Sequence, residues 1–144
     1  MKVKNILYAL AATIIFAACS KSGDSPTPTP NPPTPPTPTE ASIVFSIDID
    51  PGSGSIFSAT GASQAMKVTV SSTLPTAGVQ VDVKTNRDAD NTTISSSSLA
   101  STAAAISASI DSLKPGVLCT TTVVVTSKST SSNSATKTFK IVRK

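Results

Sequence analysis

The stretch 110–125 constrains the fold of this 144-residue chain more than any other. It reads IDSLKPGVLCTTTVVV, so an apolar anchor, Leu113, leads through Pro115-Gly116 into a run of β-branched residues. Val and Thr are stiff at χ1 and fit a pleated surface, which predicts a strand. Side chains alternate along a strand, so four residues are expected to share one inward face: Cys119, Thr121, Val123 and Val125.

The spacing Leu-x-Pro-Gly-x-x-(Tyr)-x-x-x-Val resembles the corner before strand F of fibronectin type III and related Ig-like sandwiches. In those families a tyrosine usually fills the position held here by Cys119. The ending Phe-Lys-Ile-Val-Arg-Lys, after a Ser/Asn-rich loop, also resembles Ig-like modules of bacterial surface lipoproteins. The resemblance implies that residues 41–144 form an all-β, Greek-key sandwich of about seven strands.

Hydrophobic alternation elsewhere in 41–144 predicts antiparallel strands with one buried face. The inward positions are expected to be Ile43, Phe45, Ile47, Ile49, Met66, Val68, Val70, Val79, Val81, Val83, Phe139 and Ile141. A short strand is expected at 56–57 and a short edge strand at 92–95. The basic residues near the end (Lys137, Lys140, Arg143 and Lys144) predict that the last strand, 135–142, is a solvated edge blunted by charge.

The stretch 99–113 fits two periods. Five apolar residues match a helical stripe: Leu99, Ala103, Ile106, Ile110 and Leu113. Strand alternation fits as well, with Ala104, Ile106, Ala108 and Ile110 on one side. The Ser/Thr content and the resemblance favour a strand.

Residues 1–18 are predicted to be a lipoprotein signal peptide. Two lysines precede an apolar run of about 13 residues, too short to span a bilayer comfortably. The run ends Phe16-Ala17-Ala18-Cys19, which resembles the lipobox of bacterial lipoproteins. The resemblance implies cleavage before Cys19 and acylation of that residue, which would anchor the chain in a membrane. The alternative is an ordinary signal peptide in which Cys19 has no role.

Residues 19–40 are predicted to be a tether. The segment 25–39 alternates Pro with Thr, and proline can build neither a helix nor a strand ladder. We expect an extended polyproline II stalk with a reach of roughly 45 Å. No Asp directly follows Cys19, so nothing resembles an inner-membrane retention signal, and we expect a lipid-anchored outer-membrane protein. Some bacteria use an acidic run after the cysteine to bring lipoproteins to the outer face. Here Asp24 alone stands for that run, and we expect exposure at the cell surface.

Charge and composition argue against several functional classes. The formal net charge of +4 falls to +2 once Lys2 and Lys4 are removed with the leader. Nucleic-acid binding needs a basic stripe and usually stacking aromatics, and aromatics are only 3% of this chain. The sequence contains no His, so Cys119 has no histidine base to form a thiolate, and its parity predicts a buried, inert thiol. We expect no cofactor and no catalysis.

Two weaker site predictions remain. Asp88-Ala-Asp90-Asn91 could supply oxygen ligands to Ca²⁺, although no bidentate Glu follows and Asp and Asn are ordinary turn residues. The Asp48/Asp50 pair is the only other acidic pair. Asp111-Ser112-Leu113 resembles an Asp-Ser/Thr-apolar tripeptide of a bacterial O-glycosylation system, which implies a glycan on Ser112.

Two functions are consistent with these features. The first is a structural or accessory Ig-like lipoprotein that works through protein partners in the cell envelope. The second is a module that binds a carbohydrate or an adhesion ligand. Carbohydrate sites on sandwiches usually present Trp and Tyr, whereas the chain has no Trp and its one tyrosine, Tyr8, lies in the leader. The first function is therefore favoured.

Overall fold

The computed structural model describes residues 39–144. Within them the chain forms eight strands: β1 (Phe45–Ile47), β2 (Ile56–Ala59), β3 (Gln64–Val70), β4 (Val79–Arg87), β5 (Thr93–Ser101), β6 (Ala105–Ile110), β7 (Leu118–Ser127) and β8 (Ser134–Arg143). The predicted signal segment, Cys19 and the tether up to residue 38 lie outside the described residues. No helix in 39–144 has the length and apolarity that a membrane crossing requires.

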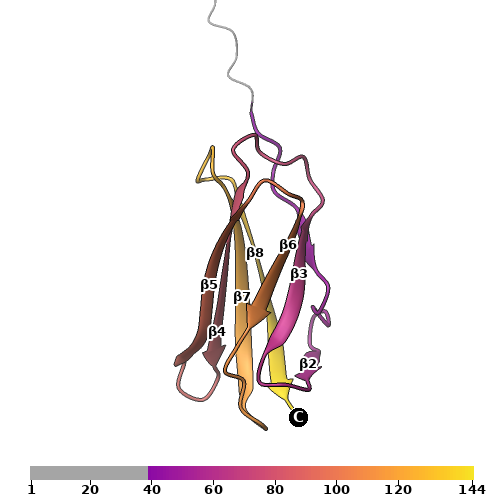
Figure 1. Cartoon of the computed structure of the whole chain (residues 1–144), viewed down its shortest axis with the longest axis vertical. Helices are drawn as coiled ribbons and strands as arrows, with labels where there is room; N and C mark the ends of the chain where they lie inside the picture. The colour runs from indigo at the N-terminus through magenta and orange to yellow at the C-terminus, as the bar shows by residue number, and fades with distance from the viewer. Residues whose placement is uncertain (1–38) are drawn as a thin grey trace, which may run out of the picture. The chain divides into compact units, whose positions relative to one another are not determined.

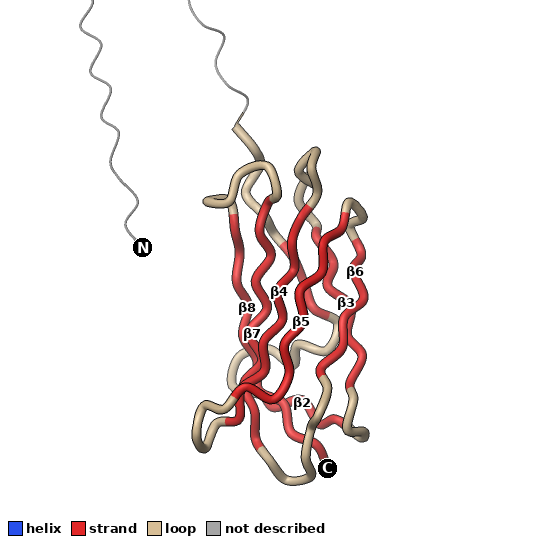
Figure 2. The backbone as a smooth tube through the Cα atoms, turned by 60° about the vertical axis from the view of Figure 1, so that its left-hand side comes forward, coloured by secondary structure: helices blue, strands red, loops and turns tan. Residues whose placement is uncertain are grey.

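The strands form two sheets that pack face to face (Figures 1 and 2). One sheet has three strands in the order β1-β3-β6, and the other has five in the order β2-β8-β7-β4-β5. All neighbours are antiparallel except β2 and β8, which run parallel. The prediction of an all-β sandwich is confirmed, and the expected helical alternative for 99–113 is wrong.

The core lies between the sheets and consists largely of Val and Ile. Alternate residues of β3, β4 and β7 point inward, as the period of two requires. On β7 the inward residues Cys119, Thr121, Val123 and Val125 are all 0% exposed. Leu113 is also buried, and Gly116 (φ 70°) takes the left-handed position of the turn that leads into β7.

The prediction that the last strand is an edge is wrong. β8 lies between β7 and β2, because β2 pairs along its other side from Ile56 opposite Lys140 to Ala59 opposite Arg143. Lys140 points away from the core and pairs with Asp88, whereas half-buried Lys137 shares the face of Phe139 and Ile141 and lies 3.9 Å from Asp50. Charge on the outward face of a strand therefore does not identify an edge.

The edge strand expected at 92–95 extends much further along the chain. β5 continues to Ser101 and pairs with β4 from Val79 opposite Ser101 onward. Gly78 (φ 79°) directly precedes the first pair, and a Cβ there would come within 2.3 Å of the Ser101 carbonyl oxygen, so only glycine fits. Near the other end of the pair, consecutive Thr85 and Asn86 of β4 lie opposite Ser95 and Thr93, so Ile94 of β5 is the extra residue of a bulge.

β5 and β6 are separate strands joined by a tight turn. The Ser101 hydroxyl accepts a hydrogen bond from the Ala103 backbone N–H at 3.0 Å, which closes the turn after β5. The predicted strand alternation holds for Ile106 and Ile110, which are buried, and for half-buried Ala108, whereas Ala104 is exposed in the turn.

The chain enters the sandwich at one end and β8 finishes at the other (Figure 1). At the entry, the Asn133 side chain accepts a hydrogen bond from the Ile43 N–H at 3.1 Å. It also donates to the Ala41 carbonyl and to the Glu40 carboxylate, both at 3.0 Å. This entry clamp fixes the start of the domain to the loop between β7 and β8. The opposite end carries the turn between β4 and β5 and the loop between β6 and β7.

Candidate functional site

The predicted calcium residues lie at the end of the sandwich opposite the entry clamp, in the turn between β4 and β5. This turn borders a surface hollow of about 440 Å³, which we call the turn hollow. Its lining is entirely polar: Asn86, Arg87, Asp88, Asn91, Thr120, Thr122 and Lys140. The register explains how three strands contribute, because Asn86 of β4 lies opposite Thr120 of β7, and Thr120 lies opposite Lys140 of β8.

Asp88 is the one carboxylate among the residues that line the turn hollow. It forms an ion pair with Lys140, and it accepts a hydrogen bond from the Thr120 hydroxyl at 2.6 Å. The Lys140 ammonium, and then the Thr120 hydroxyl, hold the pKa of Asp88 below its usual value. The carboxylate is therefore ionised and already balanced by a protein cation at neutral pH.

Asp90 and Asn91 serve the turn itself. Asp90 accepts the Thr92 backbone N–H at 3.1 Å, and this bond is the main cause of its lowered pKa. Arg87 lies 3.1 Å from the same carboxylate oxygen, although its Nε–H is not aligned for a hydrogen bond. Asn91 adopts φ 57° and accepts a hydrogen bond from the Asn86 amide at 2.9 Å.

These contacts bear on the choice between calcium and turn chemistry. The three predicted ligands share one turn. However, each of their oxygen atoms named above already interacts with a cation, a hydroxyl, a backbone N–H or an amide. Across residues 39–144 no three His, Cys, Asp or Glu side chains gather in a group that could hold a metal ion. The geometry favours a structural role for Asp88, Asp90 and Asn91 in the turn, and calcium binding at this turn stays an untested prediction.

The other acidic pair, Asp48 and Asp50, has the same kind of role. Asp48 accepts the Lys67 backbone N–H at 2.8 Å, and Asp50 accepts the Gly52 backbone N–H at 3.0 Å. Both therefore organise the turn that follows β1.

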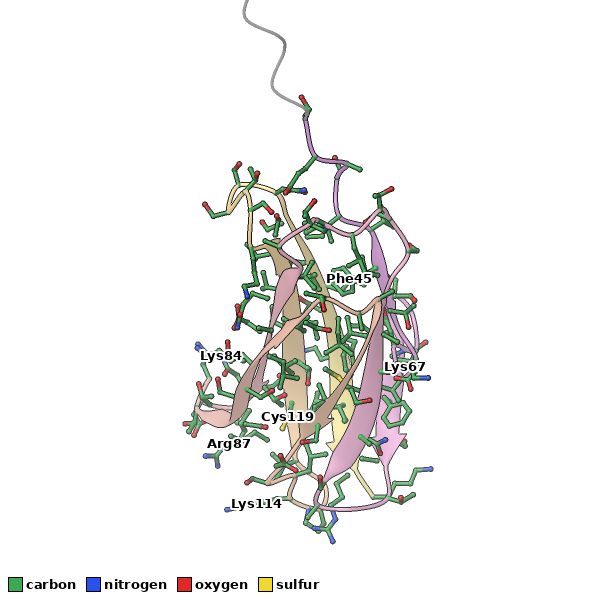
Figure 3. The ribbon with its side chains drawn as sticks, turned by 45° about the horizontal axis from the view of Figure 1, so that its top comes forward. Phe45, Lys67, Lys84, Arg87, Lys114 and Cys119 are labelled. Carbon is green, nitrogen blue, oxygen red and sulfur yellow. The ribbon has the colours of Figure 1, made fainter. Side chains whose placement is uncertain are left out.

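Cys119 lies among the strands, inside the sandwich (Figure 3). It is 0% exposed and free of any disulfide. Burial, and then the negative charge of Asp88, raise the pKa of the thiol above its ordinary value. A protonated thiol shielded from solvent is a poor nucleophile, as its inward parity on β7 predicted.

Ser112 lies in the loop between β6 and β7 and is exposed, with φ 64°. Its neighbour Asp111 is held by the hydroxyls of Ser63, at 2.5 Å, and Ser109, at 3.0 Å, while Leu113 anchors the other side in the core. The Ser63 bond, and then the Ser109 bond, lower the pKa of Asp111. Ser112 is thus presented to solvent between two fixed neighbours, and its predicted glycosylation stays a prediction.

Several residues of these sites were not predicted from the sequence. Lys140 and Thr120 complete the turn hollow, but each lies far along the chain from Asp88, and only the strand register brings them together. Asn133 was predicted only as part of a polar loop, although it fixes the residues with which the chain enters the sandwich. Its long-range role has no local sequence signal, because Asn is common in any turn.

Comparison with known proteins gives no family: no family model matches the chain, and the search of curated proteins finds no match.

Proposed function

We propose that this chain is a lipid-anchored, Ig-like module of the bacterial outer membrane, exposed at the cell surface, that acts without catalysis through protein partners. Within this proposal Cys19 carries the anchor, the Pro/Thr-rich segment is the stalk, and the sandwich is the working part. The strand order supports an Ig-like or fibronectin type III-like subclass. A three-stranded sheet faces a larger one in which the strand after the Pro-Gly corner, β7, lies between β4 and β8.

The observation that carries the proposal is the entry clamp. Asn133 holds Glu40, Ala41 and Ile43, which are the first residues after the predicted stalk, at one end of the sandwich. The opposite end, with the turn hollow and the loop around Ser112, is therefore remote from the point where the stalk attaches. A module held at one end leaves its other end and its sheet edges accessible to partners.

The chemistry of the described residues fits a non-catalytic role. The one thiol in the sandwich, Cys119, is fully buried with a raised pKa, so it does not offer a thiolate to a substrate. The carboxylates at both ends of the strands are bound to backbone N–H groups, hydroxyls or cations that stabilise turns.

The anchor is tested with the full-length chain produced in a bacterium that has an outer membrane. We expect the protein to enter the detergent phase on Triton X-114 partitioning and Cys19→Ser to move it to the aqueous phase. Cys119→Ser is the matched control, because this buried thiol carries no anchor, and it is expected to partition as the unaltered chain does. Retention of the Cys19→Ser variant in the membrane would contradict the proposal. Digestion of intact cells with proteinase K then tests surface exposure.

A second candidate function is binding of a carbohydrate or adhesion ligand in the turn hollow. The observation in its favour is the lining of amides and hydroxyls, Asn86, Asn91, Thr120 and Thr122, which can both donate to and accept from sugar hydroxyls. Binding on a glycan array that is lost in Asn91→Ala and kept in Asn133→Ala, at the other end of the sandwich, would place this function first.

A further inference from the structure

The five-stranded sheet ends in β5, an edge strand with a bulge at Ile94 near its start and a regular stretch, 95–101, after it. Natural edge strands are short, or carry charge or proline, because unpaired N–H and C=O groups otherwise accept another strand. β5 is nine residues long and contains neither a charged residue nor a proline. The other edges, β1, β2 and β6, have three, four and six residues.

No strand within residues 39–144 pairs with the outer side of β5, which forms one margin of the sandwich (Figure 2). Ser96, Ser98 and Ala100 are exposed, and Ser95, Ser97 and Leu99 are half-buried. The hydroxyl oxygen of Ser97 is buried without a hydrogen-bond partner. The outer side of β5 is thus open within the described residues.

We propose that β5 pairs with β5 of a second copy of this chain, antiparallel and about a two-fold axis at Ser97, to join the two five-stranded sheets. The proposal deepens the proposed role as a protein-interaction module and rests on it. Such an isologous contact lets the same edge serve both partners. Ser97 is the midpoint of β5, and because Ile94 is bulged, this register pairs the regular residues 95–99 of each copy.

Charge on the neighbouring strand matches this register. Asp82 of β4 lies opposite Ser98, and Lys84 lies opposite Ser96. With the axis at Ser97, Ser98 of one copy faces Ser96 of the other, so each cross-sheet row runs Asp82, Ser98, Ser96, Lys84. An acid and a base then occupy the two ends of each row of four strands, and the three spacings between these strands put their backbones about 14 Å apart.

The side chains bring the charges of Asp82 and of Lys84 in the other copy closer together than their backbones are. The Ser98 hydroxyl donates a hydrogen bond to Asp82, which draws the carboxylate toward β5. Lys84 projects outward (Figure 3), and strand parity places it on the same exposed face of β4 as Asp82. An axis at Ser98 would instead place Asp82 in a row with Asp82 of the other copy, so the charges favour Ser97 as the centre.

A single strand pair is a small interface, below the roughly 1,000 Å² that stable complexes bury. Association is therefore expected to be weak and concentration-dependent in free solution. Two copies held on one membrane would meet at a much higher effective concentration.

The test uses the full-length chain with Cys19→Ser, so that no acyl chain drives association. Analytical ultracentrifugation up to about 1 mM, the weak end of specific affinity, is expected to show a species of twice the monomer mass. Ser96→Lys with Ser98→Lys blunts the edge and is expected to abolish it. Thr136→Lys with Thr138→Lys adds the same charge to exposed positions of β8 and is expected to leave it unchanged.

Cysteine pairs test the register. In the Cys19→Ser background, mild oxidation of a mixture of the Ser96→Cys and Ser98→Cys chains is expected to give a disulfide-linked dimer that contains one of each. Either variant alone is expected to give none, because like positions would be about 8 Å apart, beyond the Cα separation that a disulfide spans. A dimer from either variant alone overturns the Ser97 axis.

Observation of a monomer at every concentration would overturn the pairing of two copies. The edge would then be available to a strand of a different protein. This failure differs from failure of the proposed function. The anchor is read from detergent partitioning of the Cys19 variants, which does not depend on β5.

Discussion

β7 and β5 lie two positions apart in the same sheet, and their inward faces meet different surroundings. β7 has a neighbour on each side, and its inward residues from Cys119 to Val125 are 0% exposed. β5 has one neighbour, and its inward residues Ser95, Ser97 and Leu99 are only half-buried. The sandwich is therefore held together by its central strands, whereas its margin at β5 is weakly packed and available for contact.

The largest expected loss of stability comes from a substitution in the central strands. Ile141 of β8 is 0% exposed, so Ile141→Ala should lower the free energy of unfolding by about 2–5 kcal/mol through lost burial and a cavity. Leu99→Ala on β5 is the matched change at the margin and should cost about 1 kcal/mol or less, because its site is half open. Urea denaturation measures both. Equal losses would show that the margin is packed as tightly as the centre.

The next effect concerns the buried hydroxyls of the centre. Thr85 and Thr121 face each other across β4 and β7, with their Oγ1 atoms 2.9 Å apart and both residues 0% exposed. Thr121→Val should cost about 1–3 kcal/mol, because it strands the Thr85 hydroxyl, while the double change to Val at both positions should be nearly neutral. A double-mutant cycle on urea unfolding measures the coupling. Additive losses would show that the two hydroxyls do not depend on each other.

Substitution of Ser97 at the margin should raise the stability, in contrast to the losses expected at the centre. The Ser97 hydroxyl is buried without a partner, so Ser97→Ala removes an unsatisfied polar group and should raise the midpoint of urea denaturation slightly. The gain is expected to stay within about 1 kcal/mol. A clear loss of stability would mean that the hydroxyl finds a partner in solution, such as an ordered water.

The smallest expected effect concerns the ion pair between Asp88, in the turn after β4, and Lys140 of β8 on the outer surface. The pKa of Asp88 is lowered by Lys140, so this pair stabilises the fold above the unfolded pKa of Asp, about 4, and its contribution is lost as the pH falls toward the folded value. The pair is partly exposed, so the contribution should be below about 1 kcal/mol. The fall in melting temperature between pH 6 and pH 3 should be smaller in Asp88→Asn than in the unaltered chain. Asp82→Asn, at an exposed carboxylate with no ion pair among the described residues, is the control.

The contrast between the two strands also explains what the sequence could predict. The β-branched run of β7 predicted a strand, and the period of two then grouped Cys119, Thr121, Val123 and Val125 on the face that is buried. β5 is mostly serine and has no such β-branched run, so only its first residues were predicted. Its full length depends on pairing with β4 and on the close approach of Gly78 to Ser101, and both are tertiary features.

The same reason separates predicted from unpredicted sites. Asp88, Asp90 and Asn91 are adjacent in the chain, so their common turn could be predicted. Lys140 could not be placed beside them, since its neighbour depends on the order of the strands, and its charge suggested an edge that β2 occupies. The buried thiol of Cys119 was predicted from parity alone. Acylation of Cys19 stays a prediction that its detergent partitioning tests.

The position of the entry clamp also determines how the module would bear mechanical load. A pull between the proposed stalk and a proposed partner at the opposite end would act along the strands. Ladder hydrogen bonds lie across the strands, so such a force loads many of them in shear at once and does not peel them open one by one. A domain arranged in this way is suited to withstand tension.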